Sequence, residues 1–368
     1  MQVHRVVMPA SGVESWTVLG DDDVPIAPVE AYLAYLTDIE RSPNTVRAYA
    51  HDLKDYWEFL AQRGLDWREV RLEAVGEYVA WLRLPPAGRD GAVAVLPSAE
   101  PRVAASTINR KLSALASFYS HQARHGVDVG ELLVRWQLPG RRGGWKPFLH
   151  HVSKDKPQPR RVIAVKAPRK LPRVLTVSEV QTLLDACDRL RDRFLLALLY
   201  ESGVRVGEAL GLRHVDIAAA DCQVTVVPRL NDNGARSKSR QPRTIPVSDG
   251  LIRLWADYLH AEYGEIDSDY VFVNLFAEPC GRAMSYAAVY DLVLRLRRRT
   301  GIDFDPHWCR HTMATRLLRD QVPIEVVSHL LGHRSTTTTL SIYGHLSVED
   351  ARTALEAAGW FTGTGVNL

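Results

Sequence analysis

Residues 305–345 contain four side chains that could act together on one phosphate group. They are His307, Arg310, His333 and Tyr343: two imidazoles, a guanidinium and a phenol. Arg310 can present a planar fork to two phosphoryl oxygens, and the histidines can donate to other oxygens or move a proton. The hydroxyl of Tyr343 could attack phosphorus. The combination predicts a phosphate site that includes a nucleophile.

Each of these residues also has an ordinary structural interpretation. His307 could be a capped core histidine, and Tyr343 could be a buried aromatic residue. His333 follows Gly332, and glycine is favoured where a helix ends. Taken one at a time these explanations are the simpler ones. The joint spacing favours a phosphate site, and a second half of such a site occurs upstream.

The upstream half follows an apolar run at residues 194–199. Arg205 comes two residues after Gly203, at a turn that leads into a helical pattern. An arginine at a helix start lies beside backbone N–H groups that also face an anion. Glu208 is three positions further on, so it shares a helical face with Arg205 and could hold its guanidinium. The alternative is an ordinary surface ion pair.

Lys238 is the only lysine from residue 171 to the end of the sequence, in a region with many arginines. It lies between two strand-like runs, residues 224–227 and 244–247, which are joined through turn residues at 231–234. A lysine can release its proton at useful pH whereas an arginine cannot. Lys238 is therefore the natural general acid for a leaving alkoxide. The alternative is a solvated lysine at a hairpin tip.

These residues occur in one order: Arg205, Lys238, His307-x-x-Arg310, Leu331-Gly332-His333 and Tyr343. In this order and spacing the set resembles the tyrosine recombinase (phage integrase) family. The segment between His333 and Tyr343 departs from the family pattern, because it is rich in threonine and slightly longer than in Xer-type members. The departure concerns the local helix register, and no other tyrosine competes nearby as the nucleophile.

The resemblance implies a mainly α fold with a small β-hairpin or sheet, of the α+β class. It implies a four-helix core-binding domain and a catalytic domain that form a clamp around DNA. The expected boundaries are an N-terminal extension at residues 1–26, the helical domain at 27–136, a basic proline-rich linker at 137–173 and the catalytic domain with a tail helix at 174–368. The implied partners are double-stranded DNA with a specific recombination site and three further copies of the chain, as a homotetramer on two duplexes.

Local signals mark several of these elements. Residues 3–8 and 16–19 of the extension are strand-like. Ser42 precedes Pro43, as an N-cap residue and the first residue of a helix do. Thr176 and Glu179 have the spacing of a capping box at the start of the second domain. These signals favour a helical first domain with a short β segment in front of it.

Basic side chains on the second and fourth helices of the first domain are the expected DNA contacts, because the resemblance places those helices against the duplex. They are Arg47, Lys54, Arg110 and Lys111. A solvated helix face is the alternative for each residue. Helical bundles with basic faces are common, so this half of the chain carries less information than the second.

Residues 139–173 contain eleven lysines and arginines and a single acid, Asp155. Six prolines in the segment prevent a regular helix. This composition predicts an extended linker that follows a nucleic-acid backbone. If about six of these charges meet phosphates, DNA affinity should fall by about three decades between roughly 50 and 200 mM salt.

The 368 residues are 46% hydrophobic and 24% charged, with a net charge of +3, as in a globular protein of two domains. No apolar run reaches the roughly 20 residues of a membrane helix, and the N-terminus lacks a secretion signal, so we expect a cytoplasmic protein. The four cysteines are scattered, which fits a reducing compartment. No nucleotide-binding loop or carboxylate cluster occurs, and His307, Cys309 and His311 diverge on a helix. We therefore expect neither a cofactor nor a metal.

The residues imply a mechanism that needs neither metal nor ATP. Arg205 and Arg310 would stabilise the pentacoordinate oxyanion, Tyr343 would form a 3′-phosphotyrosyl bond, and Lys238 would protonate the leaving 5′ oxygen. We therefore expect a site-specific recombinase for DNA integration, excision or transposition, from a transposon or integrative element. A type IB topoisomerase shares this chemistry but reseals its own strand. A DNA-binding accessory protein that has lost catalysis is a second alternative.

Overall fold

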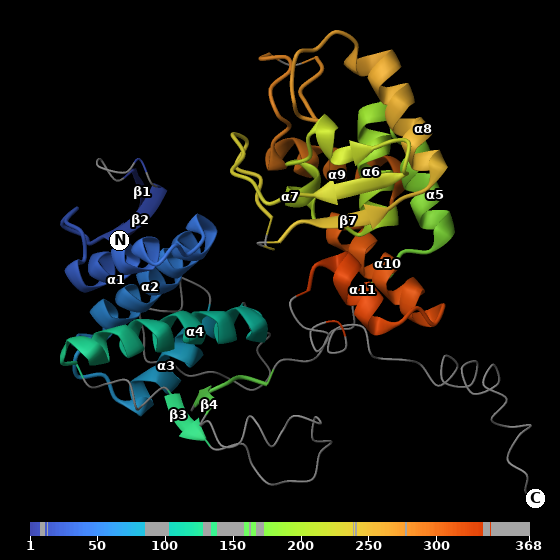
Figure 1. Cartoon of the computed structure of the whole chain (residues 1–368). Coiled ribbons are helices and arrows are strands. Elements are labelled where there is room, and N and C mark those ends of the chain that lie inside the picture. The colour runs from blue at the N-terminus through green and yellow to red at the C-terminus, as the bar shows by residue number, and fades with distance from the viewer. Residues whose placement is uncertain are drawn as a thin grey trace, which may run out of the picture. The chain divides into compact units, whose positions relative to one another are not determined.

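The computed structural model describes the chain in two units, Met1–Arg169 and Lys170–Leu368 (Figure 1). The described residues are 1–7, 12, 14–84, 103–127, 134–137, 158–161, 163–166, 173–237, 239, 241–276, 278–333 and 339. Lys238, Tyr343 and the expected tail helix therefore lie outside them. Among the described residues, no helix is long and apolar enough to span a membrane.

The described residues of the N-terminal unit form four α-helices: α1 (Ala27–Asp38), α2 (Pro43–Arg63), α3 (Leu72–Arg83) and α4 (Ala105–Gln122). A 3₁₀ turn, Ala123–His125, continues α4. The predicted start of α2 is confirmed, since Ser42 accepts a hydrogen bond from the amide of Thr45 and Pro43 is the first helical residue. Aromatic side chains fill much of the core between the helices, and Tyr32, Tyr56, Phe59, Trp81 and Phe118 are buried there.

The expected strands in front of α1 form an antiparallel hairpin, β1 (Gln2–Val7) and β2 (Glu14–Leu19). Val18 lies in the core of the helical unit, and Trp16 packs against it. The hairpin therefore belongs to the helical unit of this chain.

A second antiparallel pair, β3 (Val134–Gln137) and β4 (Gln158–Arg161), lies at the end of the same unit. Asn109 then binds the backbone of Val165 twice: its Nδ2 donates to the carbonyl at 2.8 Å, and its Oδ1 accepts from the amide at 3.0 Å. Within the expected linker, residues 158–161 therefore pair with β3, and Asn109 ties Val165 to the helical unit.

The C-terminal unit consists of helices around a small sheet. Its helices are α5 (Val177–Asp185), α6 (Leu190–Ser202), α7 (Val206–Ala209), α8 (Asp249–Tyr258), α9 (Tyr286–Thr300), α10 (Pro306–Arg319) and α11 (Ile324–Leu331). The antiparallel sheet has the order β5 (Ile217–Ala218), β6 (Gln223–Val226) and β7 (Arg243–Pro246). The predicted capping box at the start of α5 is confirmed, with Thr176 and Glu179 in reciprocal hydrogen bonds.

Helix α6 is the central element of this unit, and it packs against both α8 and α10. Phe194, Leu195, Leu198 and Leu199 are all buried, as expected for a helix that is apolar on several faces. Helix α11 lies beside α10 and also contacts β7 (Figure 1). The end of α6, the start of α10 and the end of α11 therefore approach one another, and the candidate active site lies there.

Candidate active site

Arg205 and Glu208 form the first part of the site, at the turn between α6 and α7. Arg205 is the N-cap residue of α7, and its Nη1 donates to Oε1 of Glu208 at 2.9 Å. The Oε2 of Glu208 accepts the backbone N–H of Arg205 at 3.0 Å. The predicted support of Arg205 by Glu208 is confirmed. A simple surface pair is excluded, because the carboxylate of Glu208 is buried.

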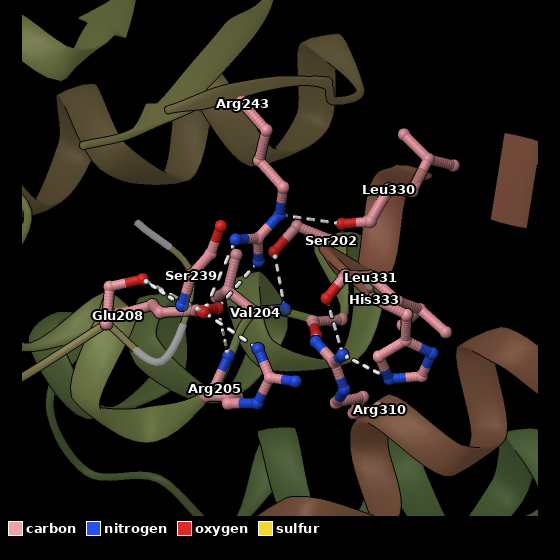
Figure 2. Close-up of polar contacts among 12 residues, drawn as sticks. Ser202, Val204, Arg205, Glu208, Ser239, Arg243, Arg310, Leu330, Leu331 and His333 are labelled. Atoms are coloured by element: carbon pink, nitrogen blue, oxygen red, sulfur yellow. Dashed lines mark hydrogen bonds and ion pairs between the residues drawn. The ribbon is translucent and has the colours of Figure 1, made fainter. Parts of the chain in front are cut away.

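Arg310 occupies the centre of the site and is only 1% exposed. Its Nη1 donates to the carbonyl of Gly203 at 2.7 Å, and its Nη2 donates to the carbonyl of Leu331 at 2.5 Å. The same Nη2 donates to Nε2 of His333 at 3.0 Å. The guanidinium on α10 thus joins the ends of α6 and α11, and it holds the imidazole of His333 in place (Figure 2).

His333 is fixed on both sides of its ring. Its Nδ1 lies 2.8 Å from the hydroxyl of the buried Thr339, in the threonine-rich segment that leads to Tyr343. Burial lowers the pKa of His333 to about 4, and the neighbouring charges of Arg310, Arg205 and other cations act in the same direction. The imidazole is therefore neutral in this arrangement at physiological pH.

His307 lies at the first turn of α10 and is exposed. Asp305 caps this helix by accepting the amide of His307 at 2.8 Å. The ring of His307 lies 4.5 Å, centroid to centroid, from His311 one turn along. Burial, together with the charges of His307 and Arg310, lowers the pKa of His311 to about 4. Cys309, between the two histidines, lies in the hydrophobic core.

The residues on either side of Lys238 are anchored over α7. Asn233 donates from Nδ2 to the carbonyls of Leu210 and Met284, at 3.1 and 2.9 Å. The amide of Ser239 donates to Oγ of Ser237 at 3.2 Å. Strands β6 and β7 pair antiparallel, which confirms the predicted strands on both sides of the turn, each shifted by one residue. The Oγ of Ser237 also donates to Oε1 of Glu208 at 3.5 Å, so the residue that precedes Lys238 lies at the edge of the site.

The structure adds one residue that the sequence reasoning missed, the buried Arg243 of β7. Its Nη2 donates to Oε2 of Glu208 at 2.6 Å, so Glu208 binds two arginines. The strand alternates between buried and exposed positions, and Arg243 and Ile245 are its buried residues. That alternation is visible in the sequence and could have identified Arg243 as an inward-facing charge.

A pocket of about 390 Å³ opens beside Arg205 and His307. Its walls are largely apolar, with Val204 and Val206 from the turn and Val293 from α9. Four basic residues, Arg205, Arg236, Arg297 and His307, line this pocket together with Asp305, whereas Arg310 is enclosed.

Two of the expected DNA-binding residues on α2 have partners within the N-terminal unit. The guanidinium of Arg47 stacks 5.0 Å from the ring centroid of Trp16 in the hairpin. The Nζ of Lys54 forms an ion pair with Glu58 at 2.7 Å. Both interactions leave the side chains at the surface, where such contacts contribute little to stability.

The other two expected DNA-binding residues, on α4, converge on the buried Asp52 of α2. Lys111 is 8% exposed and binds Asp52 at 3.1 Å and Asp55 at 2.7 Å. Arg110 also binds Asp52, but its side chain is about half exposed. Burial raises the pKa of Asp52, whereas Lys111 and then Arg110 act against that rise. The burial of Lys111 favours a structural role for this residue over a phosphate contact.

Models of known protein families match both units of the chain. Residues 173–350 match the model of the phage integrase family, and residues 29–126 match the phage integrase N-terminal SAM-like domain. The chain is 38% identical to transposase A from transposon Tn554 of Staphylococcus aureus, over 96% of each protein. It is 28% identical to the tyrosine recombinase XerC of Roseiflexus castenholzii, over 88% of this chain and 90% of that protein.

Solved structures share the fold. The Tn1549 transposon integrase in complex with transposon right end DNA matches 90% of this chain and 98% of that one, with a TM-score of 0.61 and 17% identity. A lambda integrase dimer bound to a core site matches 86% of this chain and 94% of that one, with a TM-score of 0.57 and 16% identity. The chain therefore belongs to the phage integrase family and is a tyrosine recombinase, an enzyme of site-specific DNA recombination or transposition.

Proposed function

We propose that Arg205, Lys238, His307, Arg310, His333 and Tyr343 form one active site that cuts and rejoins DNA through a 3′-phosphotyrosyl intermediate. The observation that carries the proposal is the convergence of Arg205 with Arg310 and His333, which lie more than a hundred residues later in the chain (Figure 2). Ion pairs and carbonyl contacts hold these cationic and imidazole groups before any substrate arrives. Such preorganised donors stabilise the charge that develops on a phosphoryl group.

Each residue then has a role that follows from its chemistry. The exposed guanidinium edge of Arg205 donates hydrogen bonds to a non-bridging oxygen. Arg310 stabilises the same negative charge. His307 and His333 hydrogen-bond the phosphoryl oxygens or move protons, including the phenol proton that Tyr343 loses. Tyr343 attacks phosphorus, its bond to the 3′ phosphate forms, and the bond to the 5′ oxygen breaks. Lys238 transfers a proton to that leaving oxygen. Attack of a 5′ hydroxyl on the phosphotyrosine releases Tyr343 and restores a phosphodiester.

We propose transposition as the biological use of this chemistry. The relative with 96% mutual coverage is named a transposase, and its 38% identity exceeds the 28% found for the XerC recombinase. The DNA partner would be a duplex with a specific site, contacted by residues 27–136 and by the basic residues of 137–173. A homotetramer on two duplexes would complete the exchange, since two strands are cut in each partner duplex.

Covalent capture tests this proposal. The protein is expressed in a host that carries its native flanking DNA, then denatured and purified under stringent washing, and any attached DNA is sequenced. The wild type should retain DNA concentrated at one sequence, and Tyr343→Phe should retain none although it still binds that DNA natively. Attachment spread evenly over the genome would instead indicate a topoisomerase. Native binding without covalent DNA in the wild type would contradict the catalytic assignment.

A further inference from the structure

Arg243 is a buried cation at the site that lies outside the expected catalytic set. Its Nη2 and Nη1 donate to the two carboxylate oxygens of Glu208, at 2.6 and 3.3 Å. Its Nε donates to the carbonyl of Leu330 at 2.8 Å. Because Glu208 in turn binds Arg205, the guanidinium of Arg243 connects α7 to the end of α11 (Figure 2).

The contact with α11 extends to the glycine before His333. Gly332 caps α11 with a φ of +63°, and a Cβ added there would lie 2.9 Å from Nη1 and 3.1 Å from Cζ of Arg243. The backbone of Gly332 therefore lies directly against the guanidinium. A shift of Arg243 would release the turn that presents His333, while a larger residue at 332 would displace Arg243.

The charges around Glu208 also connect Arg243 to Arg205. Burial alone would raise the pKa of Glu208, but the hydrogen bonds and charge of Arg243, followed by those of Arg205, lower it to about 2. Glu208 therefore stays ionised and keeps its hold on Arg205. Without Arg243 the buried carboxylate would lose its main stabilising partner, and its bond to Arg205 would weaken.

We propose that Arg243 is a positioning residue for DNA strand cleavage, which sets Arg205 through Glu208 and His333 through Leu330 and Gly332. The inference rests on the proposed function, since it assumes that Arg205 and His333 act on the scissile phosphate. Arg243 itself is buried, so its guanidinium is not accessible to a DNA phosphate. Its effect should therefore be on the rate of cleavage rather than on the affinity for DNA.

A structurally matched ion pair provides the control. Asp216 is buried, accepts the backbone N–H of Arg213 at 2.9 Å and binds Arg229 through both oxygens, at 2.5 and 2.7 Å. Like Glu208, Asp216 is a buried carboxylate that accepts a backbone amide and binds an arginine, but none of these contacts involves a proposed catalytic residue. Arg229 is 28% exposed and Arg243 3%, so Arg229→Gln should destabilise the protein less than Arg243→Gln and should not slow cleavage.

The experiment measures single-turnover cleavage and Kd on the duplex recovered by covalent capture, for two forms of the scissile linkage. One is the ordinary phosphodiester, and the other is a methylphosphonate, in which a neutral methyl group replaces a charged non-bridging oxygen. Arg243→Gln should cleave the phosphodiester about 100-fold more slowly, with Kd within about twofold of wild type. On the methylphosphonate its loss should shrink to less than about tenfold, because less charge remains for Arg205 to neutralise. Arg229→Gln should cleave both substrates at the wild-type rate.

Other variants keep the proposal falsifiable if Arg243→Gln folds poorly. Glu208→Gln combined with Arg243→Gln leaves no unpaired buried charge, and it should still lose about 100-fold in rate. Arg243→Lys keeps one bond to Glu208 but loses the bond to Leu330. Its cleavage rate should therefore lie between those of Arg243→Gln and the wild type.

Two results would overturn the inference. One is wild-type cleavage by folded Arg243→Gln, and the other is an equal loss on both substrates, which a general folding defect would give. Cleavage by Arg205→Ala at the wild-type rate would contradict the proposed catalytic assignment, which is a different outcome from a failure of the inference about Arg243.

Discussion

Arg310 donates a hydrogen bond to Nε2 of His333 at 3.0 Å. A guanidinium has no acceptor, so Nε2 must present a lone pair, and the imidazole must be neutral with its proton on Nδ1. That proton then points to the hydroxyl of Thr339, 2.8 Å away. The proposed phosphate contact of His333 would require a proton on Nε2, because a phosphate oxygen can only accept hydrogen bonds.

We therefore predict a specific ionisation state for His333. In the free protein, nitrogen NMR should show Nδ1 protonated and Nε2 unprotonated, with a pKa of about 4. Binding of cognate DNA should raise this pKa, because the negative charge of a phosphodiester beside the ring would offset the positive charge of Arg310. A protonated Nε2 in the free protein at neutral pH would contradict the assignment.

The same shift predicts how stability varies with pH. The pKa of His333 is lowered in the folded state, so between about 6.5 and about 4 the unfolded chain binds more protons at this position. The contribution of His333 to stability is thus complete above about pH 6.5 and decreases as the pH falls toward 4. Thermal unfolding of His333→Gln should show a smaller loss between these pH values than the wild type. An identical pH profile would exclude this coupling.

Substitution by lysine should affect protein stability differently at Arg310 and at Arg205. Arg310→Lys cannot donate to Gly203, Leu331 and His333 together, and it should lose about 2 kcal/mol of unfolding free energy as well as activity. Arg205 is 20% exposed, and its guanidinium binds Glu208. Arg205→Lys should therefore change stability by less than about 1 kcal/mol while cleavage falls about 100-fold or more. Chemical denaturation and single-turnover cleavage measure the two quantities, and an equal stability loss would contradict the difference in burial.

Gly332→Ala should be more harmful than an alanine at another helix C-cap. Gly301 caps α9 with a φ of +69° and has open space around a Cβ, so Gly301→Ala should cost only the backbone strain of about 1 kcal/mol. At Gly332 the same strain is joined by the clash with Arg243, which should add at least about 1 kcal/mol. Thermal unfolding compares the two variants. Only Gly332→Ala should also slow cleavage, and equal effects of both would exclude a close contact with Arg243.

The salt dependence of DNA binding should separate a structural lysine from a DNA-binding arginine. Lys111→Met leaves the buried Asp52 with fewer partners, so it should destabilise the N-terminal unit by about 3 kcal/mol and leave the slope of log K against log salt unchanged. Arg47→Gln, if Arg47 meets a phosphate as proposed, should reduce that slope by about 0.9 and change stability little. If the slope of log K against log salt were smaller for Lys111→Met than for the wild type, Lys111 would instead contact a DNA phosphate.

The sequence by itself determined the chemistry and the local elements. The types and order of Arg205, Lys238, His307, Arg310, His333 and Tyr343 were sufficient to indicate the family, because few reactions need all of these groups together. Helix starts at Ser42 and Thr176 were also predictable, since a capping residue acts on amides only two or three positions away.

The tertiary structure decided which charges are buried and what they bind. Lys111 and Arg110 are neighbours in sequence with the same charge, yet only Lys111 is enclosed by the acids of α2. Arg243 meets Glu208 across 35 positions, and Arg310 meets Gly203 across 107. Such pairings depend on how helices and strands pack after they form, and no local pattern of residues encodes the distance between two segments far apart in the chain.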